Sequence, residues 1–149
     1  MGPDTADALR LKDIRILVVD GDAPSAKLIR AVLEHEGCEI EAVQTAKEAQ
    51  ALARSFQPHL VLTELVLSDL TGLELIHLFR SDASLSNTVI VAVTASNGPE
   101  TKRRVLEAGG GGYIRKPIDA LSFASQLASH LGRILEPARI TDERGSRTD

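Results

Sequence analysis

Four side chains that can carry charge or donate hydrogen bonds each follow an apolar run in this sequence. Asp20 ends RILVVD, Glu64 ends HLVLTE, Thr94 follows TVIVAV and Lys116 follows YIR. If these runs are parallel strands, their carboxyl ends meet at one edge of a sheet and the four side chains converge in one cleft. The charges of Asp20, Glu64 and Lys116 sum to −1, and Glu64 is long enough to reach Lys116 directly. Partly buried charges a few Å apart attract each other, although desolvation offsets much of that attraction, so the chemistry to expect is a geometrically fixed ion pair.

The elements that must position these side chains alternate between strand and helix. Strand-like apolar runs occupy residues 15–20, 38–43, 59–64, 88–93 and 113–115, and helical patterns follow each of them. This alternation with short connections predicts a single α/β domain, a doubly wound open sheet of five parallel strands in (βα)5 order. The polar strand at 38–43 is predicted at an edge, and the most apolar strand, at 88–93, is predicted at the centre.

Local signals mark where the helices begin. Asp22 is predicted to cap the first helix, and that helix to turn four apolar residues toward the core: Leu28, Ile29, Val32 and Leu33. The pairs Thr45/Glu48 and Thr71/Glu74 are T-x-x-E capping boxes, which predict helices through about 56 and 81.

The last two helices have similar start signals. Asn97, with Glu100 three positions on, is predicted to open the helix that ends at Ala108. Asp119 is predicted to cap the last helix, whose core-facing residues have helical spacing: Ala124, Leu127, Ala128, Leu131 and Leu135.

Composition narrows the classes of protein that this chain can be. Its 149 residues suit one domain, and a net charge of −4 argues against a nucleic-acid-binding face. The single cysteine, Cys38, excludes an internal disulfide, which fits a reducing cytoplasm. No apolar run is long enough to cross a membrane and the polar start lacks the core of a signal peptide. We expect residues 13–136 to form the domain, with flexible tails at 1–12 and 137–149.

Four stretches of the chain together resemble the receiver domain of bacterial two-component response regulators, over roughly residues 14–134. They are ILVVDGD, LVLTELVLSDLTGLELI, VIVAVTAS and AGGGGYIRKPI, in the family's order and close to its spacing. The resemblance implies a flavodoxin-like, or CheY-like, fold and a signalling function without enzymatic turnover. It also implies a pocket in which two adjacent acids hold Mg²⁺ and an aspartate accepts a phosphoryl group from a histidine kinase.

The resemblance assigns roles to several residues of this chain and leaves two positions unmatched. Asp20 matches the first metal-binding acid, while Thr94 and Lys116 match the groups that bind phosphoryl oxygens. Tyr113 matches the switching aromatic residue, and the resemblance implies a cis bond before Pro117 that aims Lys116 into the cleft. The unmatched positions are Gly21, where the second acid is expected, and Glu64, where the acceptor aspartate is expected.

These two departures predict a site that no longer loads phosphate. Mg²⁺ depends on each oxygen ligand, so Gly21 weakens a metal site for which Asp20 and Asp22 are the remaining candidates. Asp22 precedes Ala-Pro at a helix start, which favours a capping role over a ligand role. Glu64 is one methylene longer than aspartate and is displaced from the geometry of attack. No metal or cofactor is therefore expected unless the pocket is rescued.

Our hypothesis is that an ion pair between Glu64 and Lys116 replaces Mg²⁺ and phosphate and holds the cleft in one state. Such a pair can pull Thr94 inward with Tyr113 following, which imitates activation. A carboxylate nevertheless lacks the tetrahedral oxygens of phosphate, which favours an inactive-like or intermediate state. The sequence leaves this choice open.

The expected function is protein–protein contact independent of aspartyl phosphorylation. The expected contact surface is the fourth helix, the fifth strand and the fifth helix, around Arg103, Tyr113 and Phe123, and it also allows a homodimer. One alternative is a working phosphoacceptor with a rescued Mg²⁺ site. A second, less favoured because no glycine-rich loop joins a strand to a helix, is a small flavodoxin-like enzyme or ligand-binding protein.

Overall fold

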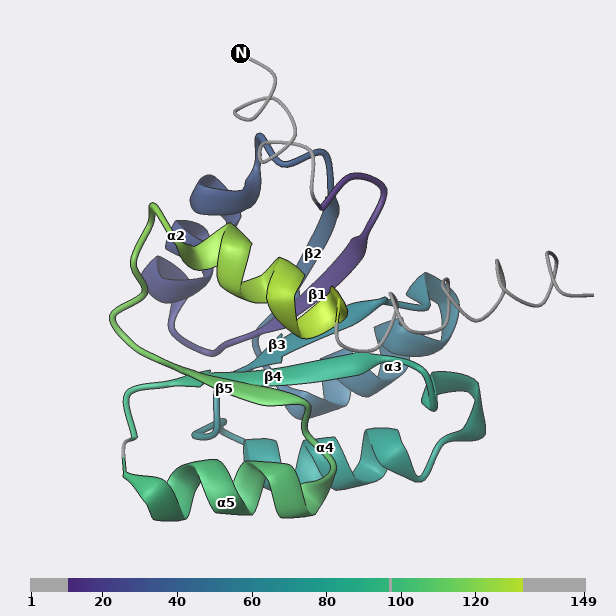
Figure 1. Cartoon of the computed structure of the whole chain (residues 1–149). Coiled ribbons are helices and arrows are strands. Elements are labelled where there is room, and N and C mark those ends of the chain that lie inside the picture. The colour runs from purple at the N-terminus through teal and green to yellow at the C-terminus, as the bar shows by residue number, and fades with distance from the viewer. Residues whose placement is uncertain (1–10, 97, 133–149) are drawn as a thin grey trace, which may run out of the picture.

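The computed structural model describes residues 11–96 and 98–132. Within these ranges the chain alternates between strand and helix, and residues 123–132 form a final helix (Figure 1). The elements before that helix are β1 (Arg15–Val19), α2 (Ala23–Leu33), β2 (Glu39–Val43), α3 (Ala46–Phe56), β3 (Leu60–Thr63), α4 (Gly72–Arg80), the 3₁₀ turn η1 (Ala83–Leu85), β4 (Val89–Thr94), α5 (Pro99–Ala108) and β5 (Gly112–Arg115).

The five strands form one parallel sheet in the order β2-β1-β3-β4-β5. This order confirms the predicted doubly wound α/β fold and the edge position of β2. The central position predicted for residues 88–93 is wrong, because β3 is the middle strand and β4 lies between β3 and β5. Hydrophobicity could not separate these two strands, since every residue of both is buried.

Helices cover both faces of the sheet, and a separate hydrophobic core lies on each side. In Figure 1, α2 and the last helix lie on one face, while α3, α4 and α5 lie on the other. Alternate residues of a strand point to opposite faces, so Ile16 and Val18 join the first core whereas Leu17 and Val19 join the second. Burial on two faces explains why the inner strands are almost continuously apolar.

Side-chain caps fix where three of the helices begin. Asp22 accepts the backbone N–H of Ser25 at the start of α2. Both predicted capping boxes are present, Thr45 with Glu48 at α3 and Thr71 with Glu74 at α4. These signals are local, so the sequence alone was enough to place these helix starts.

Four local predictions need correction or fall outside the described residues. Leu28 is 48% exposed and does not face the core, although Ile29 and Leu33 do. The N-cap of α5 is Gly98, without a side-chain cap bond, and Asn97 lies outside the described residues. Leu11, placed in the predicted tail, is fully buried in the first core. Leu135 and the predicted tail at 137–149 lie beyond the described residues.

Candidate functional site

The sheet brings the four sequence-predicted residues to its carboxyl edge. Thr94 is the last residue of β4, and the other three directly follow β1, β3 and β5. The parallel hydrogen-bond ladder continues to these positions. The amide of Glu64 donates to the Val19 carbonyl at 2.9 Å, and that of Lys116 donates to the Thr94 carbonyl at 2.9 Å. The backbone is therefore held in register up to the residues that carry the chemistry.

The Lys116 ammonium group lies between two carboxylates. Its Nζ is 2.8 Å from Oδ2 of Asp20 and 2.9 Å from Oε1 of Glu64. The three side chains are largely buried, with exposed fractions of 18% for Lys116, 3% for Asp20 and 13% for Glu64. The predicted Glu64–Lys116 contact is thus present, and Asp20 is a second partner that the sequence analysis did not pair with the lysine.

Glu64 and Lys116 stabilise each other in their charged forms. Burial alone would raise the pKa of Glu64, but hydrogen bonds from Thr94, Lys116 and the Leu65 amide, with the Lys116 charge, bring it below its ordinary value. Burial alone would lower the pKa of Lys116, but hydrogen bonds and charge from Asp20 and Glu64 raise it above its ordinary value. Both residues are consequently ionised at neutral pH.

The oxygens of the two carboxylates are engaged by groups of the protein. Oδ1 of Asp20 accepts the backbone N–H of Asp22 at 2.9 Å, and Oε2 of Glu64 accepts that of Leu65 at 2.7 Å. Asp22 is exposed and its own carboxylate caps α2, so it stands outside the cluster. Gly21 is exposed and has no side chain to offer. Within residues 11–96 and 98–132, no group of three or more His, Cys, Asp or Glu side chains is arranged to hold a metal ion.

Hydrogen bonds link Thr94 to Tyr113 through the loop after β4. The hydroxyl of Thr94 accepts the backbone N–H of Ser96 at 3.3 Å, and it helps to lower the pKa of the Glu64 carboxylate. The half-buried Tyr113 donates its hydroxyl proton to the Ser96 carbonyl. The loop after β4 therefore joins Thr94 to the aromatic residue of β5.

The peptide bond between Lys116 and Pro117 is cis, as the family resemblance implies. Pro117 is exposed and, with Leu28 and Ile118, lines an apolar hollow of about 350 Å³ beside the cluster.

The residues predicted to line a contact surface differ in their exposure. Arg103 is exposed on α5 and pairs with Glu100 and, at 2.9 Å, with Glu107. The inclusion of Phe123 in that surface is wrong, because its side chain is fully buried in the first core. An aromatic residue at the start of an amphipathic helix cannot be assigned to a face from local pattern alone.

Two residues near the site escaped sequence reasoning. The Asp69 carboxylate, in the loop after β3, accepts the backbone N–H groups of Ala46 and Lys47 at 3.0 and 2.9 Å. It thereby ties that loop to the N-terminus of α3, where a carboxylate is favoured. Gly72 begins α4 so close to the Glu64 carbonyl that a Cβ atom would lie 2.3 Å from that oxygen. Local sequence patterns do not show which residues distant in the sequence will touch, so neither contact could be predicted. The Thr71-Gly72 pair marks only the start of α4.

Comparison with known proteins decides the family. A model described as the response regulator receiver domain matches residues 16–128. The chain belongs to this family. The polar-differentiation response regulator DivK of Brucella ovis is 31% identical over 117 residues, which cover 78% of this chain and 95% of DivK.

Solved receiver structures have the same fold. A CheY-like response regulator receiver domain protein of Methanospirillum hungatei matches with a TM-score of 0.77 and 27% identity, covering 85% of this chain and 99% of that protein. The chemotaxis response regulator CheY4 of Vibrio cholerae matches with a TM-score of 0.76 and 22% identity, covering 80% and 99%. This receiver is therefore a signalling module of the response regulator type. None of its described helices has the length and apolar character to span a bilayer.

Proposed function

We propose that this receiver works by protein–protein contact without aspartyl phosphorylation, because Lys116, Glu64 and Asp20 lock its pocket. The observation that carries the proposal is the position of Lys116 Nζ, 2.8 Å from Asp20 and 2.9 Å from Glu64. One cation of the protein itself lies between the two acids. The lysine thus does what a divalent ion would otherwise do, which is to hold both carboxylates together.

The residues present do not fit Mg²⁺. This ion needs near-octahedral oxygen ligands and keeps its water reluctantly, so a site made of few carboxylates loses affinity with each one removed. Gly21 supplies no ligand, Asp22 is used as a helix cap, and one oxygen of Asp20 is bound to Lys116. We therefore propose that this receiver functions without the metal.

Glu64 fills the space in which a phosphoryl group would be bound. Of the two residues to which the resemblance assigns the phosphoryl oxygens, Lys116 bonds the Glu64 carboxylate and Thr94 helps to lower its pKa. A lysine already held by two carboxylates is not free to bind an incoming phosphoryl group. The same contacts that stabilise Glu64 as an anion support the view that it is no longer an acceptor.

We further propose that the locked pocket resembles the activated state. Activation in this family draws the hydroxyl residue toward the phosphoryl group and lets the aromatic residue follow. Here Thr94 helps to lower the pKa of Glu64 and accepts the Ser96 amide, and Tyr113 donates to the Ser96 carbonyl. These contacts favour activation mimicry over the inactive-like or intermediate state that the shape of a carboxylate had favoured.

The partner surface that we propose consists of α5, β5 and the last helix. On α5 a hollow of about 430 Å³ is lined by Pro99, Lys102, Arg103, Leu106 and Glu107. Apolar and charged side chains alternate around it, as at the rim of a protein interface. We expect a protein partner here, which can be a second copy of the chain.

Incubation with a small phosphodonor and Mg²⁺, followed by intact-mass measurement, tests the proposal. The native chain is expected to gain no phosphoryl group, whereas the double variant Gly21→Asp/Glu64→Asp is expected to gain one. The change at position 21 fits the backbone, because the nearest atom to a Cβ there is the Gln44 carbonyl oxygen at 3.5 Å. The matched control Gly21→Asn/Glu64→Asp has the same size without the second acid and should accept far less. A stable phosphoryl group on the native chain would overturn the proposal.

A further inference from the structure

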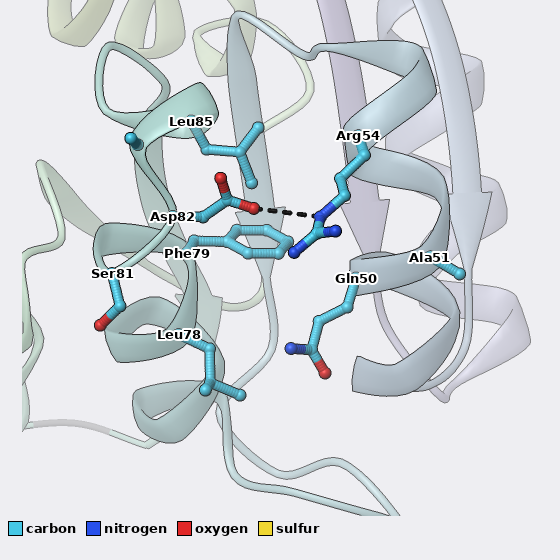
Figure 2. Close-up of a pocket in the computed structure, with 9 residues that line it drawn as sticks. Gln50, Ala51, Arg54, Leu78, Phe79, Ser81, Asp82 and Leu85 are labelled. Carbon is cyan, nitrogen blue, oxygen red and sulfur yellow. Dashed lines mark hydrogen bonds and ion pairs between the residues drawn. The ribbon is translucent and has the colours of Figure 1, made fainter.

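A groove runs between α3 and α4, on the face of the sheet away from α2 and the last helix. It has a volume of about 610 Å³, which is within the range of sites that bind ligands. Figure 2 shows Gln50 and Arg54 extending from α3 toward Leu78, Phe79 and Asp82, and Ala51 also lines the groove. None of these residues takes part in the pocket at the carboxyl edge.

The floor of the groove is apolar and its α3 wall is low. Phe79 and Leu85 form part of the second core and are almost completely buried, while Leu78 is partly exposed at the rim. Ala51 also lines the groove and adds only a methyl group to its α3 wall. An apolar side chain of an occupant would therefore remove surface from water chiefly at Leu78, which is 38% exposed.

Leu78 also lines a second hollow on α4. This hollow has a volume of about 490 Å³ and is lined by Leu70, Leu73, Glu74 and His77 as well as Leu78. The two hollows together follow the outer side of α4, which spans about 13 Å at 1.5 Å per residue. An elongated occupant such as a helix fits this shape better than a compact small molecule does.

The α3 side of the groove carries positive charge. Arg54 is 79% exposed and its Nε donates to Oδ2 of Asp82 at 3.3 Å, while Figure 2 shows its terminal amino groups turned toward the groove. The other Asp82 oxygen accepts the backbone amide and the hydroxyl of Ser84 at 3.0 and 2.8 Å. Lys47 is exposed seven residues before Arg54, which places it on the same side of α3, about 10 Å away along the axis.

We infer that this groove binds an amphipathic helix of a partner protein. Its apolar side chains pack against Phe79 and Leu78, and acidic side chains along one flank pair with Arg54 and Lys47. Glu74 on the α4 rim disfavours acidic side chains on the opposite flank, so the charges also set the direction in which the helix lies. The surface is separate from α5 and β5, so it gives the receiver a second contact face.

The test uses the full chain labelled with ¹⁵N and a synthetic peptide probe. The probe is an amphipathic helical peptide of about four turns, with leucines on one face and glutamates along one flank. Its addition is expected to shift the amide signals of Gln50, Ala51, Leu78 and Ser81. A peptide of the same pattern with lysines in place of the glutamates should bind at least several-fold more weakly, and equal binding of both peptides would overturn the inference.

Two variants locate the binding on the molecule. Arg54→Glu is expected to weaken the acidic peptide by about tenfold, whereas the matched variant Arg30→Glu, on the exposed side of α2, is expected to leave binding unchanged. Ala51→Trp should block the groove and abolish the shifts, while an unchanged circular dichroism spectrum and melting temperature show that the chain is folded. Undiminished binding by Arg54→Glu or by folded Ala51→Trp would contradict the assignment.

Discussion

Two partly buried cations lie at opposite edges of the sheet and differ in what surrounds them. Lys116, at the carboxyl edge, binds two carboxylates. Arg80, at the amino edge, donates only to backbone carbonyls, those of Leu85, Ser86, Thr88 and Gly109. Arg80 therefore joins the loop before β4 to the loop before β5 through uncharged carbonyls. Lys116 instead neutralises part of the negative charge of Asp20 and Glu64, which would repel each other without it. A structural cation and a functional one can be told apart by whether their partners titrate.

Replacement of the functional cation is expected to have the largest effect. Lys116→Met leaves Asp20 and Glu64 close together and largely buried without a counter-charge, which should cost about 3 kcal/mol of unfolding free energy at pH 7. Without Lys116, burial raises the pKa of Glu64 above its value in the unfolded chain, so stability should recover as the pH falls through that raised pKa. Urea unfolding between neutral and mildly acidic pH measures this. A loss that does not change with pH would contradict the charge-balance explanation.

Replacement of the structural cation is expected to cost less and to show no such pH dependence. Arg80→Met leaves several partly buried carbonyls without their donor, which should reduce the unfolding free energy by about 2 kcal/mol. Because carbonyls do not titrate, the difference from the native chain should be the same at neutral and mildly acidic pH. If Arg80→Met recovered stability in acid as Lys116→Met is expected to do, Arg80 and Lys116 would not differ in whether their partners titrate.

Gly72 and Gly21 lie next to the two acids of the pocket for different reasons. Gly72 is needed because there is no room for a side chain, whereas Gly21 has room for one but lacks the expected carboxylate. Gly72→Ala would place a Cβ atom 2.3 Å from the Glu64 carbonyl oxygen, and the resulting shift should cost about 1–2 kcal/mol. In Gly21→Ala the nearest atom is at 3.5 Å, so stability should change by less than about 0.5 kcal/mol. Thermal unfolding of the two variants compares them, and equal losses would show that the crowding at Gly72 can be relieved by movement.

The smallest effect concerns the native chain in acid. The folded-state pKa of Glu64 lies below its ordinary value of 4.5, so its contribution to stability is complete above that pH and is lost as the pH falls through the folded-state value. The native chain should lose stability in this window more steeply than Glu64→Gln, by at most about 1.4 kcal/mol per pH unit for one proton. Parallel curves for the two proteins would show that Glu64 is not stabilised as an anion.

Two kinds of feature in this receiver could be predicted from sequence. They are the helix starts, which depend on neighbouring residues, and the residues that meet at the carboxyl edge of the sheet. Capping boxes involve residues three apart, so Thr45 and Thr71 mark helix starts without tertiary information. The meeting of Glu64 and Lys116 follows from parallel strands that end on one edge. The contacts of Arg80 and Asp69 could not be found in this way, because their partners are backbone groups, which any residue type can supply. Leu28 and Phe123 were misassigned because helical spacing shows which residues share a face of a helix, but not how far other elements cover that face. Leu28 is 48% exposed, whereas Phe123 is fully buried.

The Asp69 carboxylate links two parts of this receiver that carry different functions in our proposals. It holds the loop that follows Glu64 to the first residues of α3, and α3 also carries Arg54 and Ala51. If movement of that loop alters how α3 sits, protonation of Glu64 changes the affinity of the groove, and an occupied groove changes the proton affinity of Glu64 by the same factor. The Asp69 carboxylate would then couple the groove to the locked pocket, although it belongs to neither of them.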